Sequence, residues 1–212
     1  MARRIGRMVT DAVLQRQIIA RVIAARLGDQ PAQPLHYLGQ VDLPGLGSRA
    51  LYARHAADAV ITDRRFQVVL ITRLHNPGAG LLALPGGFMD PVAGGVELAL
   101  DAAIREAGEE AGIDAALLRA AVLRRLGGRA FDRPFDIRIA WSDIAGTPIR
   151  QGDVFTVSTQ WFGFLLPDLG AVRLQAGDDA KAVRVARISD LLPAQFAVPD
   201  HLPQIIAAAI EP

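Results

Sequence analysis

Apolar residues follow a helical period near the N-terminus and form short runs, typical of strands, along most of the remaining chain. Within residues 10–27, Leu14, Ile18 and Val22 fall on one face of a helix. A glycine and two prolines follow, a composition that ends helices and forms linkers. We therefore expect an amphipathic helix over residues 10–27, within an N-terminal helical extension that covers residues 1–34.

Residues 35–212 are expected to form a single domain built on a sheet. Apolar runs alternate with turn-forming segments, and strands interspersed with a few helices indicate an α/β fold with a mixed sheet covered on both faces. Asp63-Arg64-Arg65 separates two apolar runs and predicts a hairpin. Strands are expected at 35–42, 50–54, 57–62, 67–73, 81–84, 123–126, 137–141, 155–165 and 183–188, and a terminal helix at 201–210.

A third kind of segment, rich in Ala, Leu and Glu, has the composition of a helix and stops at Gly112. The chain has only five glutamates, and four of them fall here, at Glu97, Glu106, Glu109 and Glu110. On a helix Glu106 and Glu110 are one turn apart, with Glu109 beside them. Like charges packed in this way destabilise a helix unless a positive group lies among them, and Mg²⁺ prefers carboxylate oxygens. The alternative is a solvated acidic face.

The order of residues is more specific than the composition. Residues 97–113 read E-x7-R-E-U-x-E-E-x-G-U, where U is apolar, and this resembles the catalytic helix of the Nudix hydrolases. The resemblance implies a Nudix-type α/β/α sandwich with a mixed sheet, and a helix that binds Mg²⁺ or Mn²⁺. It also implies hydrolysis of a nucleotide diphosphate bond.

The segment before this helix departs from the family pattern. The family's glycine six residues before the first glutamate is Pro91 here, and its glycine pair matches Gly86 and Gly87 instead. Nine residues, not five, then separate Gly87 from Glu97. We expect the surplus, at about residues 92–96, to form a longer loop, which costs little stability. Because the loop borders the metal site, it should affect substrate fit more than metal binding.

The acidic residues of the helix have separate expected roles. Glu106 and Glu110 are the first-choice metal ligands, with Glu109 as a third. The resemblance adds a backbone carbonyl from Gly86 or Gly87 to this ligand set. We expect Glu97 to orient Arg105; the simpler alternative is an i,i+4 pair of Arg105 with Asp101, and both pairings can coexist.

A carboxylate outside the helix is expected to activate or position the attacking water. The resemblance places a loop containing Asp178 and Asp179 near the diphosphate, although adjacent loop acids more often form turns or caps. Asp153 is the second candidate, and Glu109 serves if neither acts.

Substrate contacts are expected from arginines around segment 131–134. Arg129, Arg133 and Arg138 could grip phosphate or ribose with two hydrogen bonds each, although a solvated surface position is the simpler interpretation for any one of them. Aromatic residues could stack on adenine, but core packing is favoured for an aromatic in a strand. These aromatics are Phe135, Trp141 and Trp161. The four histidines show no ligand spacing and are assigned no role.

A second resemblance runs through several short segments in order. Together they are similar to the Nudix half of bifunctional NMN adenylyltransferases and to related ADP-ribose pyrophosphatases. The segments are 58–61, 84–91, 131–134, 177–180 and 196–205. This resemblance implies cleavage of ADP-ribose to AMP and ribose 5-phosphate. The alternatives are a catalytically silent module that senses an ADP-ribose-like ligand, or a hydrolase of a dinucleotide or oxidised nucleotide.

Composition limits the classes of binding partner and of cellular location that we expect. The net charge of +1 gives no case for nucleic acid or a membrane surface, and no run reaches the roughly twenty apolar residues of a membrane span. Charges interrupt the N-terminal apolar stretch, so no signal peptide is expected. The absence of cysteine excludes disulfides and fits a reducing cytoplasm.

Related ADP-ribose hydrolases commonly dimerise through N-terminal elements. We therefore expect a homodimer in which a second subunit covers the apolar stripe on helix 10–27. The alternative is that the stripe packs against its own domain.

Overall fold

The structure is a computed structural model that describes most of the chain. The described residues are 7–25, 33, 35–75, 78–93, 95–129, 137–140, 142–144, 147–177 and 179–210. Among the residues with predicted roles, Arg133, Phe135, Trp141 and Asp178 lie outside these ranges, as does the side chain of Arg129.

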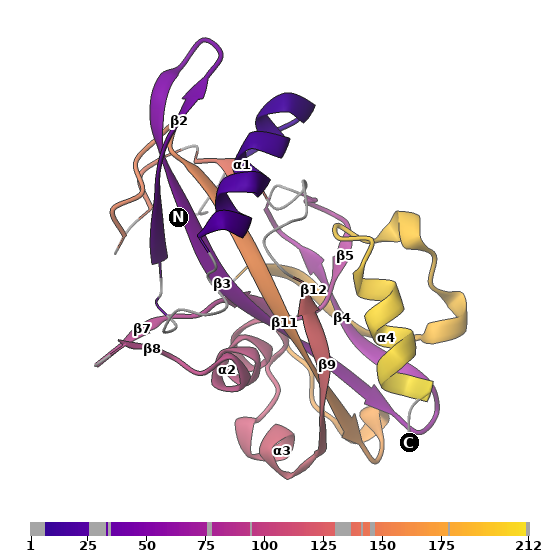
Figure 1. Ribbon diagram of the computed structural model, residues 1–212. Coiled ribbons are helices and arrows are strands. Elements are labelled where there is room, and N and C mark those ends of the chain that lie inside the picture. The colour runs from indigo at the N-terminus through magenta and orange to yellow at the C-terminus, as the bar shows by residue number, and fades with distance from the viewer. Residues whose placement is uncertain are drawn as a thin grey trace.

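Within the described residues, ten strands form one mixed sheet, with the order β1-β10-β11-β3-β4-β12 (Figure 1). β2 and β6 also pair with β3, β5 pairs with β4, and β9 pairs with β11. The strands are β1 (Arg7–Met8), β2 (Leu35–Leu43), β3 (Gly47–Asp63), β4 (Gln67–Arg73), β5 (Leu82–Ala83), β6 (Gly86–Phe88), β9 (Val122–Arg129), β10 (Arg138–Ile139), β11 (Val154–Leu166) and β12 (Ala180–Arg187). A separate hairpin is formed by β7 (Pro91–Val92) and β8 (Gly95–Val96).

Helices cover both faces of the sheet. They are α1 (Ala12–Ala24), α2 (Ala99–Ala111), α3 (Ala115–Ala120) and α4 (His201–Ile210), with short 3-10 helices at η3 (Leu169–Ala171), η4 (Ile188–Asp190) and η5 (Pro193–Gln195). None of the helices in the described ranges is long and apolar enough to cross a membrane.

The two longest strands, β3 and β11, run parallel and form the centre of the sheet. The sequence predicted two strands, 50–54 and 57–62, where the structure has the single strand β3. The interruption in the apolar pattern, at Arg54 and His55, is no interruption in the backbone, because both residues remain in register with β11. The predicted hairpin between β3 and β4 is present, with Asp63 closing the turn through hydrogen bonds from the Arg65 and Gln67 amides.

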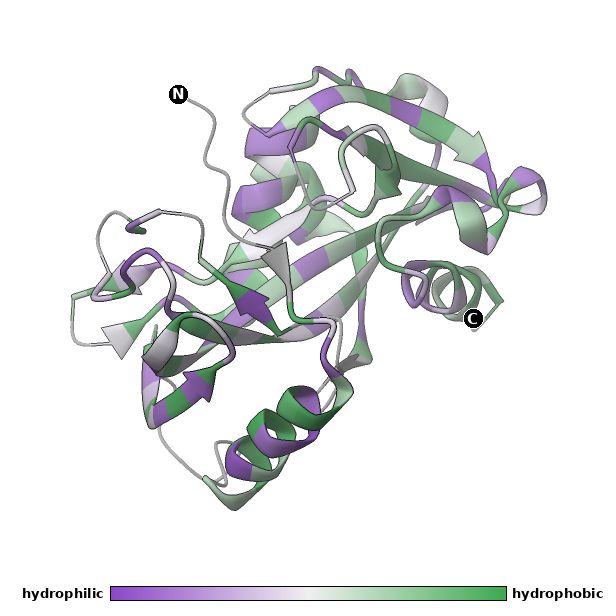
Figure 2. Cartoon of the chain, turned by 90° about the horizontal axis from the view of Figure 1, so that it is seen from above, coloured by the Kyte–Doolittle hydropathy of each residue, from purple (hydrophilic) through white to green (hydrophobic). Residues whose placement is uncertain are grey.

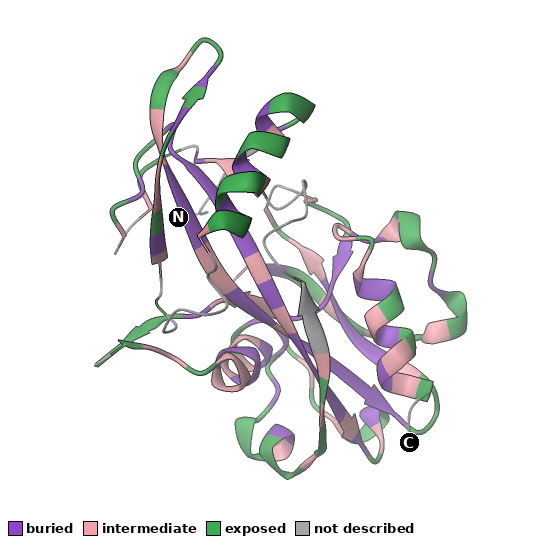
Figure 3. Ribbon diagram, viewed as in Figure 1, coloured by how far each residue is buried: buried purple, intermediate pink, exposed green. Residues whose placement is uncertain are grey.

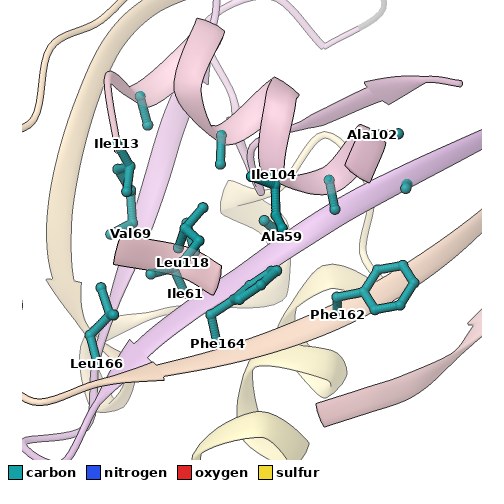
Figure 4. Packing of buried hydrophobic residues seen from close by; sticks show 14 of the residues in the cluster. Ala59, Ile61, Val69, Ala102, Ile104, Ile113, Leu118, Phe162, Phe164 and Leu166 are labelled. Atoms are coloured by element: carbon teal, nitrogen blue, oxygen red, sulfur yellow. The ribbon is translucent and has the colours of Figure 1, made fainter. Parts of the chain in front are cut away.

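Alternate residues of β3 face opposite layers, as the pleat of a strand requires. Ala59 and Ile61 pack with Ile104 of α2 and Leu118 of α3 (Figure 4). Val60 packs instead with residues of α4, which is mostly hydrophobic (Figure 2). Helices α2 and α3 therefore lie on one face and α4 on the other, which confirms the α/β/α sandwich.

The N-terminal helix α1 is also confirmed. It begins one residue after Asp11, whose carboxylate accepts a hydrogen bond of 2.7 Å from the Leu14 amide. The stripe of Leu14, Ile18 and Val22 is buried against the chain's own sheet, while the outer side of the helix is exposed (Figure 3). The stripe therefore needs no second subunit to cover it, and the homodimer stays an untested prediction.

Candidate active site

Helix α2 lies close to the sheet because one of its faces consists of small residues. Ala103, Ala107 and Ala111 are fully buried, and Gly112 ends the helix in the left-handed conformation with φ +70°. This packing leaves the polar side of α2 facing the strand β6, where the acidic residues gather.

Arg105 lies at the centre of the acidic cluster. Its Nε and Nη2 atoms donate to the two carboxylate oxygens of Glu97 at 3.1 and 2.9 Å. Its Nη1 atom donates to Glu106 and to Glu109, both at 2.9 Å. A further bond of 2.9 Å reaches the Phe88 carbonyl oxygen, so one guanidinium group joins three carboxylates to strand β6.

This geometry keeps Arg105 charged. Burial lowers the pKa of Arg105, but hydrogen bonds and charges from Glu97 and Glu106 outweigh it and hold the pKa above its ordinary value. Asp101, the alternative i,i+4 partner, forms a 2.7 Å bond with Arg119 instead.

Glu106 and Glu110 are the acids of the cluster whose pKa is raised by burial. Burial raises the pKa of Glu106 to about 7, against the opposing effect of Arg105. Burial also raises the pKa of Glu110 to about 8, although the Gly86 amide donates to its Oε2 atom at 3.0 Å. Asp58, on β3, adds to the unfavourable charge at Glu110. Both carboxylates are therefore held where ionisation is costly.

The glycine pair before the helix is required by close packing. Strand β6 pairs with β3 so that Gly87 lies opposite Ala57 and Gly86 opposite Asp58. A Cβ atom on Gly87 would collide with the Glu106 carboxylate, and one on Gly86 would collide with the Asp58 carboxylate. Only glycine allows the backbone to approach these acids so closely.

The acidic residues fit a divalent cation by their donor chemistry. In the part of the chain that the structure describes, no three acidic or histidine side chains already converge as ligands. Glu106 and Glu109 turn toward Arg105, and Glu110 turns toward the Gly86 amide. The buried oxygens of Glu106 and Glu110 are nevertheless hard ligands that Mg²⁺ or Mn²⁺ favours, and a cation would remove the cost of ionising them.

The surplus residues before Glu97 form a hairpin rather than an irregular loop. Pro91 pairs with Val96, and the strands β7 and β8 project from the body of the molecule (Figure 1). Asp90 and Glu97 close its base, because the Asp90 amide donates to Glu97 Oε2 at 3.0 Å and the Glu97 amide donates to the Asp90 carbonyl. The insertion is thus accommodated without displacing Glu97 from Arg105.

The loop that carries Asp179 packs against the C-terminal end of α2. A Cβ atom on Gly177 would lie 2.6 Å from the Glu109 carbonyl oxygen, and the Gly177 amide donates to the Glu110 carbonyl. The carboxylate of Asp179 lies 3.6 Å from His75 Nε2 and not beside the acids of α2. Asp153 is buried in its own turn, where its carboxylate accepts hydrogen bonds from the Ala50 and Arg150 amides.

Two features near the site were missed at the level of sequence; the first is Arg54, which joins the predicted contact Arg138 on one face of the sheet. Arg54 stacks on the ring of Phe88, with 3.5 Å between its Cζ atom and the ring centroid. Arg138 is half-buried on β10, in register with Phe155, which is itself in register with Tyr52 of β3. Arg138 and Arg54 therefore share one face of the sheet.

The second missed feature is the set of contacts that joins Asp58, Trp161 and His201. Trp161 is buried, as expected for core packing, and its indole N–H donates to Asp58 at 3.1 Å. His201, at the start of α4, is buried beside them. Asp58 and His201 lie in two segments of the second resemblance, 58–61 and 196–205, but no spacing in the sequence paired them.

Comparisons with known proteins agree with this geometry. A family model described as the NUDIX domain matches residues 53–206. A bifunctional NMN adenylyltransferase/ADP ribose pyrophosphatase from Francisella tularensis is 20% identical, with a TM-score of 0.50 over 92% of this chain and 46% of that one. This chain thus spans about half the length of that protein. The NUDIX domain of NrtR from Shewanella oneidensis, complexed with ADP ribose, is 19% identical, with a TM-score of 0.50 over 74% of this chain and 86% of that one.

At these identities the structural matches show the fold alone. A search of the curated proteins found no match. The family match covers well over half of the chain and includes the whole glutamate helix. The protein therefore belongs to the Nudix family.

Proposed function

We propose that this protein is a Mg²⁺-dependent hydrolase of a nucleoside diphosphate linked to another moiety, and that it cleaves ADP-ribose to AMP and ribose 5-phosphate. One observation carries the proposal. Glu110 is buried and Glu106 half-buried beside the Gly86-Gly87 backbone, and Arg105 holds Glu97 and Glu109 next to them. A cation among these acids would offset the cost of ionising them.

The cation would be held by Glu106 and Glu110, with a backbone carbonyl of Gly86 or Gly87 and with Glu109 as further candidates. When bound, it would neutralise phosphoryl charge and acidify a water molecule. Arg105 keeps Glu97 and Glu109 in fixed positions, which limits the reorganisation needed during the reaction.

The reaction adds water across the P–O–P bridge, with hydroxide going to one phosphorus and the proton to a base. Glu109 is our first candidate for this base, since its side chain is 43% exposed and can reach both water and substrate. Asp179 remains an alternative, because its loop packs against α2 although its carboxylate faces His75. Asp178, its neighbour in the sequence, also remains a candidate.

Arg138 is kept as a candidate substrate contact, and Arg54 is added to it. Their guanidinium groups would offset the charge of a diphosphate and bind it with paired hydrogen bonds. Arg129 and Arg133 remain candidates by their position in the sequence. ADP-ribose is preferred because one structural neighbour is described as an ADP ribose pyrophosphatase and another as complexed with ADP ribose.

Product analysis tests the substrate. The protein is incubated with Mg²⁺ and ADP-ribose, diadenosine polyphosphates or oxidised nucleoside triphosphates, and the products are separated by chromatography. Release of AMP and ribose 5-phosphate supports the proposal. Turnover of another diphosphate, with ADP-ribose inert, would keep the hydrolase and reject the substrate. Binding of ADP-ribose in calorimetry without cleavage would favour the sensor alternative instead.

A homodimer and a cytoplasmic location complete the proposal. The absence of cysteine supports the location. The dimer is supported by exposed apolar residues on the outer side of α1, Val13 at 55% and Ile23 at 63%. Light scattering at micromolar concentration should give twice the monomer mass for the wild type. The V13S/I23S variant should give the mass of one monomer. A wild-type monomer would refute the dimer.

A further inference from the structure

A buried polar network lies beneath residues 84–87, on the side opposite the acids of α2. It connects the turn of residues 84–87, called here the 84–87 turn, with strands β3 and β11 and helix α4. The Leu84 amide donates to His201 Nδ1 at 3.2 Å. His201 Nε2 lies 3.4 Å from Asp58 Oδ2, and Trp161 donates to the same oxygen at 3.1 Å.

The hydrogen bonds define the tautomer of the histidine. Since His201 Nδ1 accepts from a backbone amide, the ring proton of the neutral imidazole is on Nε2, facing the Asp58 carboxylate. His201 is only 4% exposed, so water does not satisfy these groups. The imidazole is thus held at both nitrogens and fixes the Leu84 amide relative to β3.

The backbone of Gly86 and Gly87 lies between this network and the acidic cluster. Asp58 lies directly under Gly86, where an added Cβ atom would collide with its carboxylate. The Gly86 amide in turn donates to Glu110, and Gly87 lies against Glu106. The 84–87 turn is therefore clamped between the acids of α2 on one side and Asp58 with His201 on the other.

We propose that Asp58 and His201 are positioning residues that fix the 84–87 turn against Glu106 and Glu110, and so set the geometry in which the acids hold a cation. The alternative is that the His201–Asp58 contact only attaches α4 to the sheet. Leu202 and Ile205 already pack that helix against the sheet, and attachment alone would not need a contact with the 84–87 turn. The His201–Leu84 hydrogen bond is the contact that serves the turn itself. This inference rests on the proposed metal dependence, and its test separates the two.

The test compares three variants of the full chain. His201→Phe keeps the ring and removes both polar contacts. His201→Asn places an amide oxygen near the position of Nδ1, so it keeps the acceptor for Leu84 and loses the contact with Asp58. Ile205→Val is the matched control, since Ile205 is a fully buried apolar residue of the same helix.

Two measurements are made without substrate: hydrogen exchange of the peptide that contains residues 84–87, and the affinity for Mn²⁺ by electron paramagnetic resonance. We expect H201F to speed exchange of the turn and to weaken Mn²⁺ binding by about tenfold, the lower end of the range for residues that orient metal ligands. H201N should retain most of the protection of the turn, and I205V should change neither readout by more than about twofold.

The proposal is overturned if H201F matches I205V in both measurements, or if its turn loosens while Mn²⁺ affinity is unchanged. If H201F does not fold, D58N decides by the same comparison, since it keeps the volume and removes the charge. A wild-type protein that binds no Mn²⁺ would refute the metal-dependent function, and hydrogen exchange would still judge the positioning of the turn.

Discussion

Glu110 is buried, with 6% of its surface exposed, and its Oε2 atom accepts a hydrogen bond from the Gly86 amide. The substitution Glu110→Gln keeps the volume and an acceptor oxygen but removes the charge that a cation needs. We expect turnover to fall by at least about 100-fold, because even the outer partners of metal ligands contribute 10–100-fold. Thermal stability without a cation should be unchanged or higher, since the amide cannot ionise and burial disfavours the ionised carboxyl. Full activity in this variant, or wild-type turnover that survives EDTA, would contradict the metal assignment.

Arg105 joins three carboxylates with a planar group that lysine cannot reproduce. In Arg105→Lys, buried acceptors of Glu97 and Glu106 lose their donors. We expect the free energy of unfolding to fall by about 1–3 kcal/mol, measured by urea unfolding. The matched control is Arg119→Lys, at the exposed pair with Asp101, where a loss of roughly 0–1 kcal/mol is expected. Equal losses at the two sites would show that Arg105 has no special structural role.

His36 and His55 form a pair that no pattern in the sequence predicted. Their Nε2 atoms lie 3.3 Å apart, and His55 Nδ1 lies 2.9 Å from the Ser158 hydroxyl. Burial lowers the pKa of His55 to about 4, with a contribution from His36, against an ordinary value of 6.5. The unfolded chain therefore binds more protons than the folded protein between these two pH values.

The contribution of this buried neutral pair to the free energy of unfolding is fully present above pH 6.5. It is lost as the pH falls toward 4. We expect the urea midpoint of His55→Gln to decline less steeply than that of the wild type across this window. At pH 8, where both imidazoles are neutral in both states, the difference between the proteins reports only the lost contacts. Parallel pH profiles for the two proteins would contradict the buried neutral pair.

At the scale of elements, we expect the hairpin β7–β8 to affect substrate fit and to have little effect on metal binding. Pro91 and Val96 are paired across its base, so deletion of residues 92–95 can be closed with little movement of Asp90 and Glu97. The deletion restores five residues between Gly87 and Glu97. We expect Mn²⁺ affinity to change by less than about threefold, since surface loops can be shortened at little cost. The KM or the preference among nucleotide substrates should change; a loss of metal binding would place the hairpin within the metal site.

Elements with a long regular pattern were predictable from the sequence. Helix α4 matches its expected range, and α2 ends at the expected Gly112. Helix α3 was not predicted, because its six residues include a single buried side chain, Leu118, and are too few to show a period. The split of β3 was wrong because polar side chains within a strand break the apolar pattern without breaking the backbone pairing.

The site was predictable only where its residues are close in the sequence. The glutamates and Arg105 lie on one helix and its approach, so their spacing specified their contacts. The hydrogen bond between Leu84 and His201 joins residues 117 positions apart, and nothing in a single sequence pairs them. Arg54 was missed for the same reason, because its partner Phe88 belongs to a different strand.

At the scale of the whole molecule, the packing of α1 decides whether residues 1–34 are a separable extension. Ile18 is fully buried against β3 and β11, in a cluster with Leu51 and Val154, whereas Ile23 on the same helix is 63% exposed. A detachable helix would tolerate change at either position. A helix that completes the core would tolerate it at only one.

We therefore expect Ile18→Ala to lower the free energy of unfolding by about 2–5 kcal/mol, and Ile23→Ala to change it by less than about 0.5 kcal/mol. Urea unfolding, followed by the fluorescence of the tryptophans, measures both, and a single transition is expected because the two parts share one core. Deletion of residues 1–34 should expose Leu51 and Val154 and reduce the stability of the remaining chain. If the truncated protein unfolds at the wild-type midpoint, residues 1–34 are an independent extension and the core of the Nudix domain ends at β2.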